Sequence, residues 1–185
     1  MATNNVNLGI GRATGMFYHA PENTALPSYP SAQLDNAWKE VGAISEDGIT
    51  FSPAKDSETL KNWAKKVERL LPSEDNPTVQ APIIYTTEEA MKTIFGSSFV
   101  TTAAAGAGHG STVSISVASA NLPGKEAFLF LMKDGDDLMM LGTTSGIIKA
   151  VDDVTMSPSE AITWTATIEA SSWTFCKEDT SSLSS

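Results

Sequence analysis

Few side chains of this 185-residue chain have the types and spacing that chemistry requires. The segment GIGRATG (9–15) supplies glycines, but a dinucleotide-binding fingerprint also needs a preceding strand and a following βαβ unit, and the sequence predicts neither. His19 and His109 lie far apart and outside any ligand-like pattern, whereas a zinc site needs about three or four ligands. Serine, histidine and aspartate occur without a nucleophile-elbow sequence, so nothing favours acyl transfer.

Aspartates form two short groups that resemble calcium ligands only superficially. Their spacing misses the EF-hand loop, and no glutamate follows at the position of the bidentate ligand, so solvated turns are the favoured interpretation. The residues are Asp134, Asp136, Asp137, Asp152 and Asp153. Cys176 is the only cysteine, which excludes an intramolecular disulfide and favours a small residue near the core. We therefore predict no catalytic residue, no cofactor and no metal.

Composition and charge narrow the classes of protein further. Apolar residues make up 41% of the chain, and the longest apolar runs fall far below the roughly 18–20 residues that span a bilayer, so we expect no membrane partner. The N-terminus has no apolar signal-peptide core, which predicts a cytosol-like compartment. A formal net charge of −10 disfavours gripping nucleic acid from outside, because that grip comes from Lys and Arg. The acidity fits either solubility or a surface that stays near nucleic acid without adhering.

The elements that must position any site are mostly strands. Alternation of apolar and polar residues predicts half-buried strands at 111–119, with Val113, Ile115 and Val117 inward, and at 161–172. In the second of these strands the inward residues are Ile162, Trp164, Ala166 and Ile168. Asp-Gly pairs predict a hairpin turn at 47–48 and another turn at 134–135.

One helix is predicted over residues 87–95. Thr86 and Glu89 have the spacing of a capping box, and Gly96 is placed to end the helix in a left-handed conformation. The predicted buried face consists of Ala90, Met91, Ile94 and Phe95. A shorter turn or helix is expected around Leu34, Trp38 and Val41, ended by Gly42.

Residues 57–71 are ambiguous. Their apolar residues fall on one helical face, so periodicity alone predicts a helix that Pro72 ends. These residues are Leu60, Trp63, Ala64, Val67, Leu70 and Leu71.

The predicted organisation is a single domain, residues 1–185. It consists of a flexible N-terminal arm (1–14), a mainly β core (15–172) and a polar C-terminal tail (173–185). The fold class is an antiparallel β-sandwich or barrel with one flanking helix.

An ordered series of motifs over about residues 18–172 resembles the major tail tube proteins of long, flexible-tailed bacteriophages, particularly those of actinobacterial hosts. The series starts with Ala20-Pro21, Thr24-Ala25-Leu26-Pro27, Trp38, Gly42, Ser45 to Ile49, and Trp63. The stretch TTEEAMKTIFG then resembles the single helix of that family, and residues 126–171 resemble its last strands.

The resemblance implies a structural, non-enzymatic subunit of a virion tail, assembled in the host cytoplasm. Copies of the chain would form hexameric rings that stack into a hollow tube, with transient passage of DNA and an acidic lumen. The further partners implied are a tape-measure protein and the tail terminator and distal tail proteins. In similar proteins the segment matching 57–71 is extended, which favours a long projecting hairpin or loop over the helix. Candidate lumen or inter-subunit residues are Asp47, Asp56, Glu58 and Trp63.

Two alternatives stay open at this point. One is another assembly-forming β-sandwich, such as a type VI secretion tube subunit or a capsid decoration protein. The other is a small carbohydrate-binding or hydrolytic β-domain that uses Trp38, Trp63, Trp164 or Trp173, although core packing is the favoured role of these tryptophans.

Overall fold

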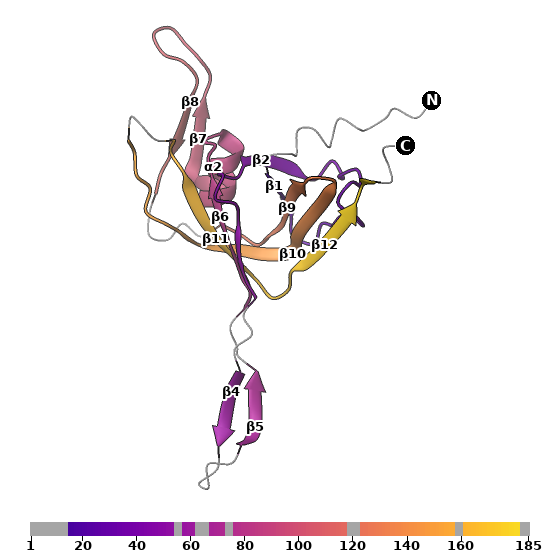
Figure 1. The fold of residues 1–185 in the computed structure, drawn as a ribbon. Helices are drawn as coiled ribbons and strands as arrows, with labels where there is room; N and C mark the ends of the chain where they lie inside the picture. The colour runs from indigo at the N-terminus through magenta and orange to yellow at the C-terminus, as the bar shows by residue number, and fades with distance from the viewer. Residues whose placement is uncertain are drawn as a thin grey trace.

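A computed structural model describes residues 15–53, 57–61, 67–72, 76–117, 123–157 and 161–181; for 57–61 and 67–72 it describes the backbone alone. The largest element is an eight-stranded antiparallel sheet with strand order β2-β1-β9-β10-β11-β6-β3, in which β12 also pairs with β10 (Figure 1). Its strands are β1 (Met16–Pro21), β2 (Lys39–Ala43), β3 (Thr50–Ser52), β6 (Thr78–Ile83), β9 (Glu126–Asp134), β10 (Asp137–Val151), β11 (Trp164–Ala170) and β12 (Thr174–Asp179).

The sheet curls until the end of β2 meets the end of β6, the strand next to the far edge. The Ile84 N–H donates to the Ala43 carbonyl at 3.2 Å, and the Ser45 N–H donates to the Pro82 carbonyl at 2.8 Å. An isolated bridge joins Ile44 to Ile83 between these two bonds. The predicted mainly β sandwich or barrel with one helix is therefore confirmed, in the form of a partly closed barrel.

The main core fills the inside of this curl. Phe17 stacks on Phe130 with ring centroids 4.6 Å apart, and both side chains are fully buried. Strand β11 contributes Trp164, Ala166 and Ile168, all buried, as its alternating sequence predicts. A second cluster on the opposite face of β1 and β9 includes Tyr18, Leu129 and Trp38. The segment between β1 and β2 carries Trp38, so it covers that face.

Helix α2 (Glu88–Phe95) confirms the predicted helix and its buried face. Its N-cap lies one residue later than predicted, because the Thr87 side chain accepts the Ala90 N–H, while Thr86 Oγ1 accepts the Trp164 indole N–H instead. Gly96 ends the helix with φ 90°, and its N–H donates to the Lys92 carbonyl. A short 3-10 helix, η1 (Ser97–Phe99), follows directly.

Two small hairpins project from the main sheet in roughly opposite directions (Figure 1). Strands β4 (Ser57–Lys61) and β5 (Val67–Pro72) pair antiparallel as a two-stranded sheet of their own. The helix that periodicity predicts over 57–71 is therefore wrong for the described residues, and the extended alternative is confirmed. Strand pairing overrides the weak helical signal of this segment.

The second hairpin consists of β7 (Val100–Ala103) and β8 (Thr112–Ile115). Ile115 packs against the core, but Val113 is 42% exposed and Val117 is 70% exposed. The prediction that both valines point inward is therefore wrong. Their alternation with serines is typical of a half-buried strand, but this hairpin extends beyond the core that would cover them.

Both predicted Asp-Gly turns are present, but only the one at Gly135 joins two strands that pair with each other. Gly135 has φ 58° in the two-residue connection between the paired strands β9 and β10. The 45–48 turn does not close a hairpin, because β2 pairs with β1 whereas β3 pairs with β6. Of the turn or helix predicted around Trp38, the turn is present, since the Trp38 N–H donates to the Asp35 carbonyl at 3.0 Å, and Gly42 lies inside β2.

The predicted tail from residue 173 contains strand β12, which pairs with the first part of β10. Part of this tail therefore belongs to the sheet. Within the described ranges, no helix has the length and apolar character that crossing a bilayer requires.

Candidate functional site

Asp47, the first of the predicted assembly residues, lies at the tip of an exposed turn. The Gly48 N–H donates to the Ser45 carbonyl at 3.0 Å, and Gly48 has φ 72°, a conformation that favours glycine. The Ser45 hydroxyl accepts the Asp47 N–H at 3.2 Å and lies 3.2 Å from the Asp47 carboxylate. The carboxylate is thus oriented by its own turn and faces solvent.

Of the other three predicted residues, the structure describes only Glu58. Glu58 is on β4, where its backbone is paired with that of Leu71. Asp56 and Trp63 lie outside the described residues. The structure therefore places Asp47 and Glu58 on different elements.

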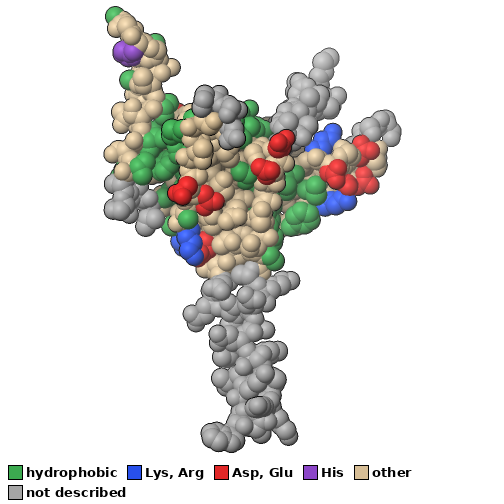
Figure 2. All heavy atoms as spheres, turned by 60° about the vertical axis from the view of Figure 1, so that its left-hand side comes forward, with side chains coloured by type: hydrophobic (Ala, Val, Ile, Leu, Met, Phe, Trp, Pro, Cys, Tyr) green, Lys and Arg blue, Asp and Glu red, His purple; other side chains and the backbone are tan. Residues whose placement is uncertain are grey.

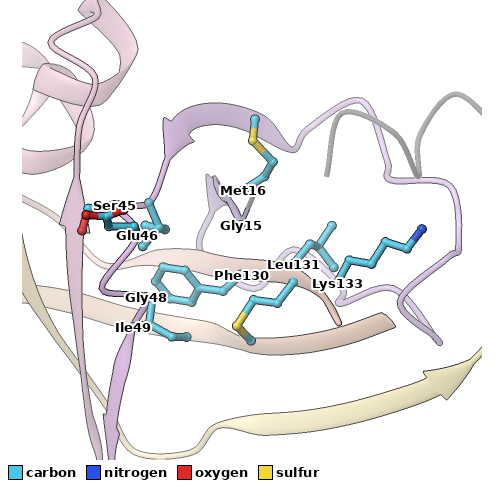
Figure 3. A pocket seen from close by; sticks show the side chains of 11 residues that line it. Gly15, Met16, Ser45, Glu46, Gly48, Ile49, Phe130, Leu131 and Lys133 are labelled. Carbon is cyan, nitrogen blue, oxygen red and sulfur yellow. The ribbon is translucent and has the colours of Figure 1, made fainter. Parts of the chain in front are cut away.

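A groove lies beside the Asp47 turn, and we call it the Ile49 groove (Figure 3). It encloses about 280 Å³ between the turn and the ends of β1 and β9. Figure 3 shows Glu46 and Lys133 at opposite ends, with Ile49 and Phe130 between them. Its lining residues are Gly15, Met16, Ile44, Ser45, Glu46, Gly48, Ile49, Phe130, Leu131, Met132 and Lys133. Apolar side chains therefore dominate the groove, with a charge at each end.

His19 forms the most concentrated polar cluster of the described residues. Its Nδ1 lies 2.8 Å from Glu126 Oε2 and its Nε2 lies 2.8 Å from Glu89 Oε1. A neutral imidazole has one N–H, so it could donate to only one of these two carboxylates. The geometry therefore fits the imidazolium, which donates to both.

The electrostatics agree with this protonation state. Burial lowers the pKa of His19, but hydrogen bonds and charge from Glu126 and Glu89 outweigh burial and raise it above its ordinary value. Burial raises the pKa of Glu89, but His19 and then Lys39 outweigh it and lower the pKa. The Lys39 Nζ lies 3.6 Å from Glu89 Oε1.

The His19 cluster joins β1, β2, β9 and α2, and it borders a cleft of about 600 Å³. Its chemistry is that of an ion-pair clamp, because both imidazole nitrogens are occupied. Sequence reasoning missed it: Glu89 and Glu126 are 70 and 107 residues from His19, so no short spacing pattern could reveal the contact.

The three tryptophans that the structure describes pack inward. Trp38 and Trp164 are buried at 8% and 9% exposure, and Trp173 packs against the core beside Phe51 and Phe130. The Trp38 and Trp173 indoles donate to the carbonyls of Ala25 and Pro77. These three residues therefore form no exposed platform on which a sugar could stack.

Comparison with protein families decides between the remaining classes. The family model described as phage tail tube protein matches residues 1–181. The chain belongs to the phage tail tube protein family. A comparison with curated proteins found no match.

Membership of this family indicates the role of the chain and where it acts. The role is structural, the location is the virion tail, and the chain assembles with copies of itself into a tube. A tail tube subunit functions through the surfaces that meet other subunits.

Proposed function

We propose that this chain is the major tail tube subunit of a long, flexible-tailed phage of the kind that infects actinobacteria. Six copies form a ring, and rings stack into a hollow tube that conducts the genome. The observation that carries the proposal is the match to the tail tube family across residues 1–181.

The projecting β4–β5 hairpin supports an assembly role. A lone two-stranded hairpin is marginally stable in water, and β4 and β5 pair only with each other among the described strands. Contact with a neighbouring subunit would supply the missing layer. Because the hairpin surface of one copy would meet a different surface of the next, the contact is heterologous and produces an open-ended stack.

Exposed edges support lateral contacts. Strand β3 ends the main sheet, and β12 pairs on one side only among the described strands. Open edges with unpaired N–H and C=O groups are templates for pairing with another chain. In this proposal they join the subunits within a ring.

Charge supports passage of DNA without adhesion. A formal charge of −10 per chain gives about −60 for six copies, before screening that acts over about 8 Å at physiological salt. Figure 2 shows acidic side chains in several separate groups on one face of the molecule. We assign Asp47, Asp56, Glu58 and Trp63 to the lumen or to contacts between subunits.

Co-expression with the phage's tape-measure and tail terminator proteins tests this function. The expected result is tubes of uniform length, because a tape-measure protein would set the length and a terminator would stop growth. Distal tail proteins would cap the other end. A chain that stays monomeric with all of these partners present would overturn the proposal.

A further inference from the structure

The β7–β8 hairpin extends beyond the core and carries no charge. Val113 on β8 and Val117 just after it are exposed. No Asp, Glu, Lys or Arg occurs between Lys92 and Lys125, although charged residues make up 18% of the chain. Because charged residues are depleted at the centres of protein–protein interfaces, this hairpin has the composition of a contact surface rather than that of a solvated loop.

One face of the hairpin continues the buried face of its own subunit. Val100 lies opposite Ile115 where β7 pairs with β8. Val100 is buried and Ile115 packs against the core. Val113 lies two residues from Ile115 along β8, so it is on the same face but nearer the tip, where it is exposed. We call this side of the hairpin the Val113 face.

A second exposed apolar surface lies on the inner side of the curled sheet, where the start of β12 approaches β3. Phe51 on β3 is 40% exposed, and Phe175 on β12 is 60% exposed. The Trp173 ring joins this surface to the core, since its centroid lies 6.4 Å from that of Phe51 and 6.3 Å from that of Phe130. Phe175 lies opposite Leu141, which lies opposite Phe130, so Phe175 extends a row of core residues outward. We call Phe51, Trp173 and Phe175 the β12 patch.

The hairpin and the β12 patch lie on different sides of the molecule. In Figure 1 the β7–β8 hairpin rises at the upper left, whereas β12 lies at the right. The two surfaces therefore do not meet within one subunit. The chain assembles with copies of itself, and contact between two different surfaces of neighbouring copies is heterologous, the kind of contact that rings and tubes require.

We propose that the Val113 face of the β7–β8 hairpin packs against the β12 patch of a neighbouring copy, with Val113 beside Phe175. This contact rests on the proposed function, since it needs a second copy of the chain. The Lys177 Nζ beside the patch lies 2.6 Å from Asp137 Oδ2, so this charge is already paired and an uncharged hairpin suits the site. Among the described strands β12 pairs only with β10, which leaves its other edge free to accept a strand of the hairpin.

Cysteine cross-linking between two variants tests the contact. In a Cys176→Ser background, subunits with Val113→Cys are mixed at high concentration with subunits with Phe175→Cys. The mixture should form disulfide-linked dimers about tenfold faster than a mixture of Ser114→Cys with Phe175→Cys, because Ser114 points to the opposite face of β8. Non-reducing electrophoresis measures both rates. Equal rates would overturn the proposal, and so would Val113→Cys subunits that cross-link faster with themselves than with Phe175→Cys subunits.

Electron microscopy of the same mixtures separates this contact from tube formation. Cross-links at the expected rate without tubes would support the contact and contradict the stacking in the proposed function. Tubes without cross-links would overturn the contact and leave the proposed function in place.

A charge on the hairpin gives a second readout without new thiols. Val113→Asp should raise the concentration needed for assembly at least tenfold in analytical ultracentrifugation, because the contact would bury an unpaired carboxylate. Ser114→Asp, on the opposite face, should change it less than twofold. Both positions are exposed, so the unfolding midpoints of the two variants should match that of the wild type. Equal effects of the two variants on assembly would contradict the proposal.

Discussion

At the scale of single residues, His19 concentrates more interactions than any predicted site residue. We expect His19→Ala to lower the free energy of unfolding by about 1–2 kcal/mol, because it leaves Glu89 and Glu126 without their shared donor. We expect a modest loss of stability because both carboxylates keep about 30% of their side-chain surface exposed to water, which can solvate them when His19 is removed. Urea unfolding measures it. His109→Ala, in the exposed β7–β8 loop, is the matched control and should change stability by less than about 0.5 kcal/mol.

The His19 cluster also predicts a pH dependence. A raised folded pKa means that the His19 contribution is complete below its ordinary value of 6.5 and disappears as pH rises through the folded value. The lowered pKa of Glu89 means that its contribution is complete above 4.5 and disappears as pH falls through the folded value. Both contributions are therefore fully present between about pH 4.5 and 6.5.

Unfolding curves of the wild type and His19→Ala across pH 5 to 9 measure this dependence. The stability difference between the two proteins should be largest near pH 5–6 and should shrink as pH rises. A difference that grows toward pH 9 would show that His19 is not the protonated clamp.

At the scale of elements, β2 has a position that only glycine fills well. Gly42 has φ 152°, and a Cβ there would lie 2.7 Å from Tyr85 Cδ2 and 3.0 Å from Tyr85 Cβ. We expect Gly42→Ala to destabilise the fold by about 1–3 kcal/mol in thermal or urea unfolding. Gly124→Ala is the control, because nothing lies within 4 Å of its Cβ position. Equal stabilities of the two variants would contradict this account of the strand.

Elements with short-range signals could be predicted from the sequence. Alternation in 161–172 predicts which side of β11 is buried, and the 87–95 helix follows from its apolar face and its cap residues. Local sequence patterns gave wrong predictions where contacts between distant parts of the chain determine the structure. The apolar spacing of 57–71 fits a helix, but strand pairing forms β4 and β5 instead. Val113 and Val117 alternate with serines as in a half-buried strand, but both are exposed, whereas Ile115 between them packs against the core. The assembly residues were predicted only from the family resemblance. No local sequence pattern predicted the His19 cluster, because its members are far apart in the chain.

At the scale of the whole molecule, folding and assembly should be separable. Because β4 and β5 pair only with each other among the described strands, replacing residues 57–72 by a short Gly-Ser linker should leave the main sheet intact. We expect its unfolding midpoint to stay close to that of the wild type while stacking into tubes is lost. A variant that unfolds would show instead that the hairpin supports its own subunit.

Negative-stain electron microscopy of the purified protein at high concentration tests whether this chain builds a tube. We expect rings and stacked tubes for the wild type, and rings or single subunits without tubes for the variant lacking 57–72. Uniformly monomeric wild-type particles at every concentration, or closed rings that never stack, would contradict it.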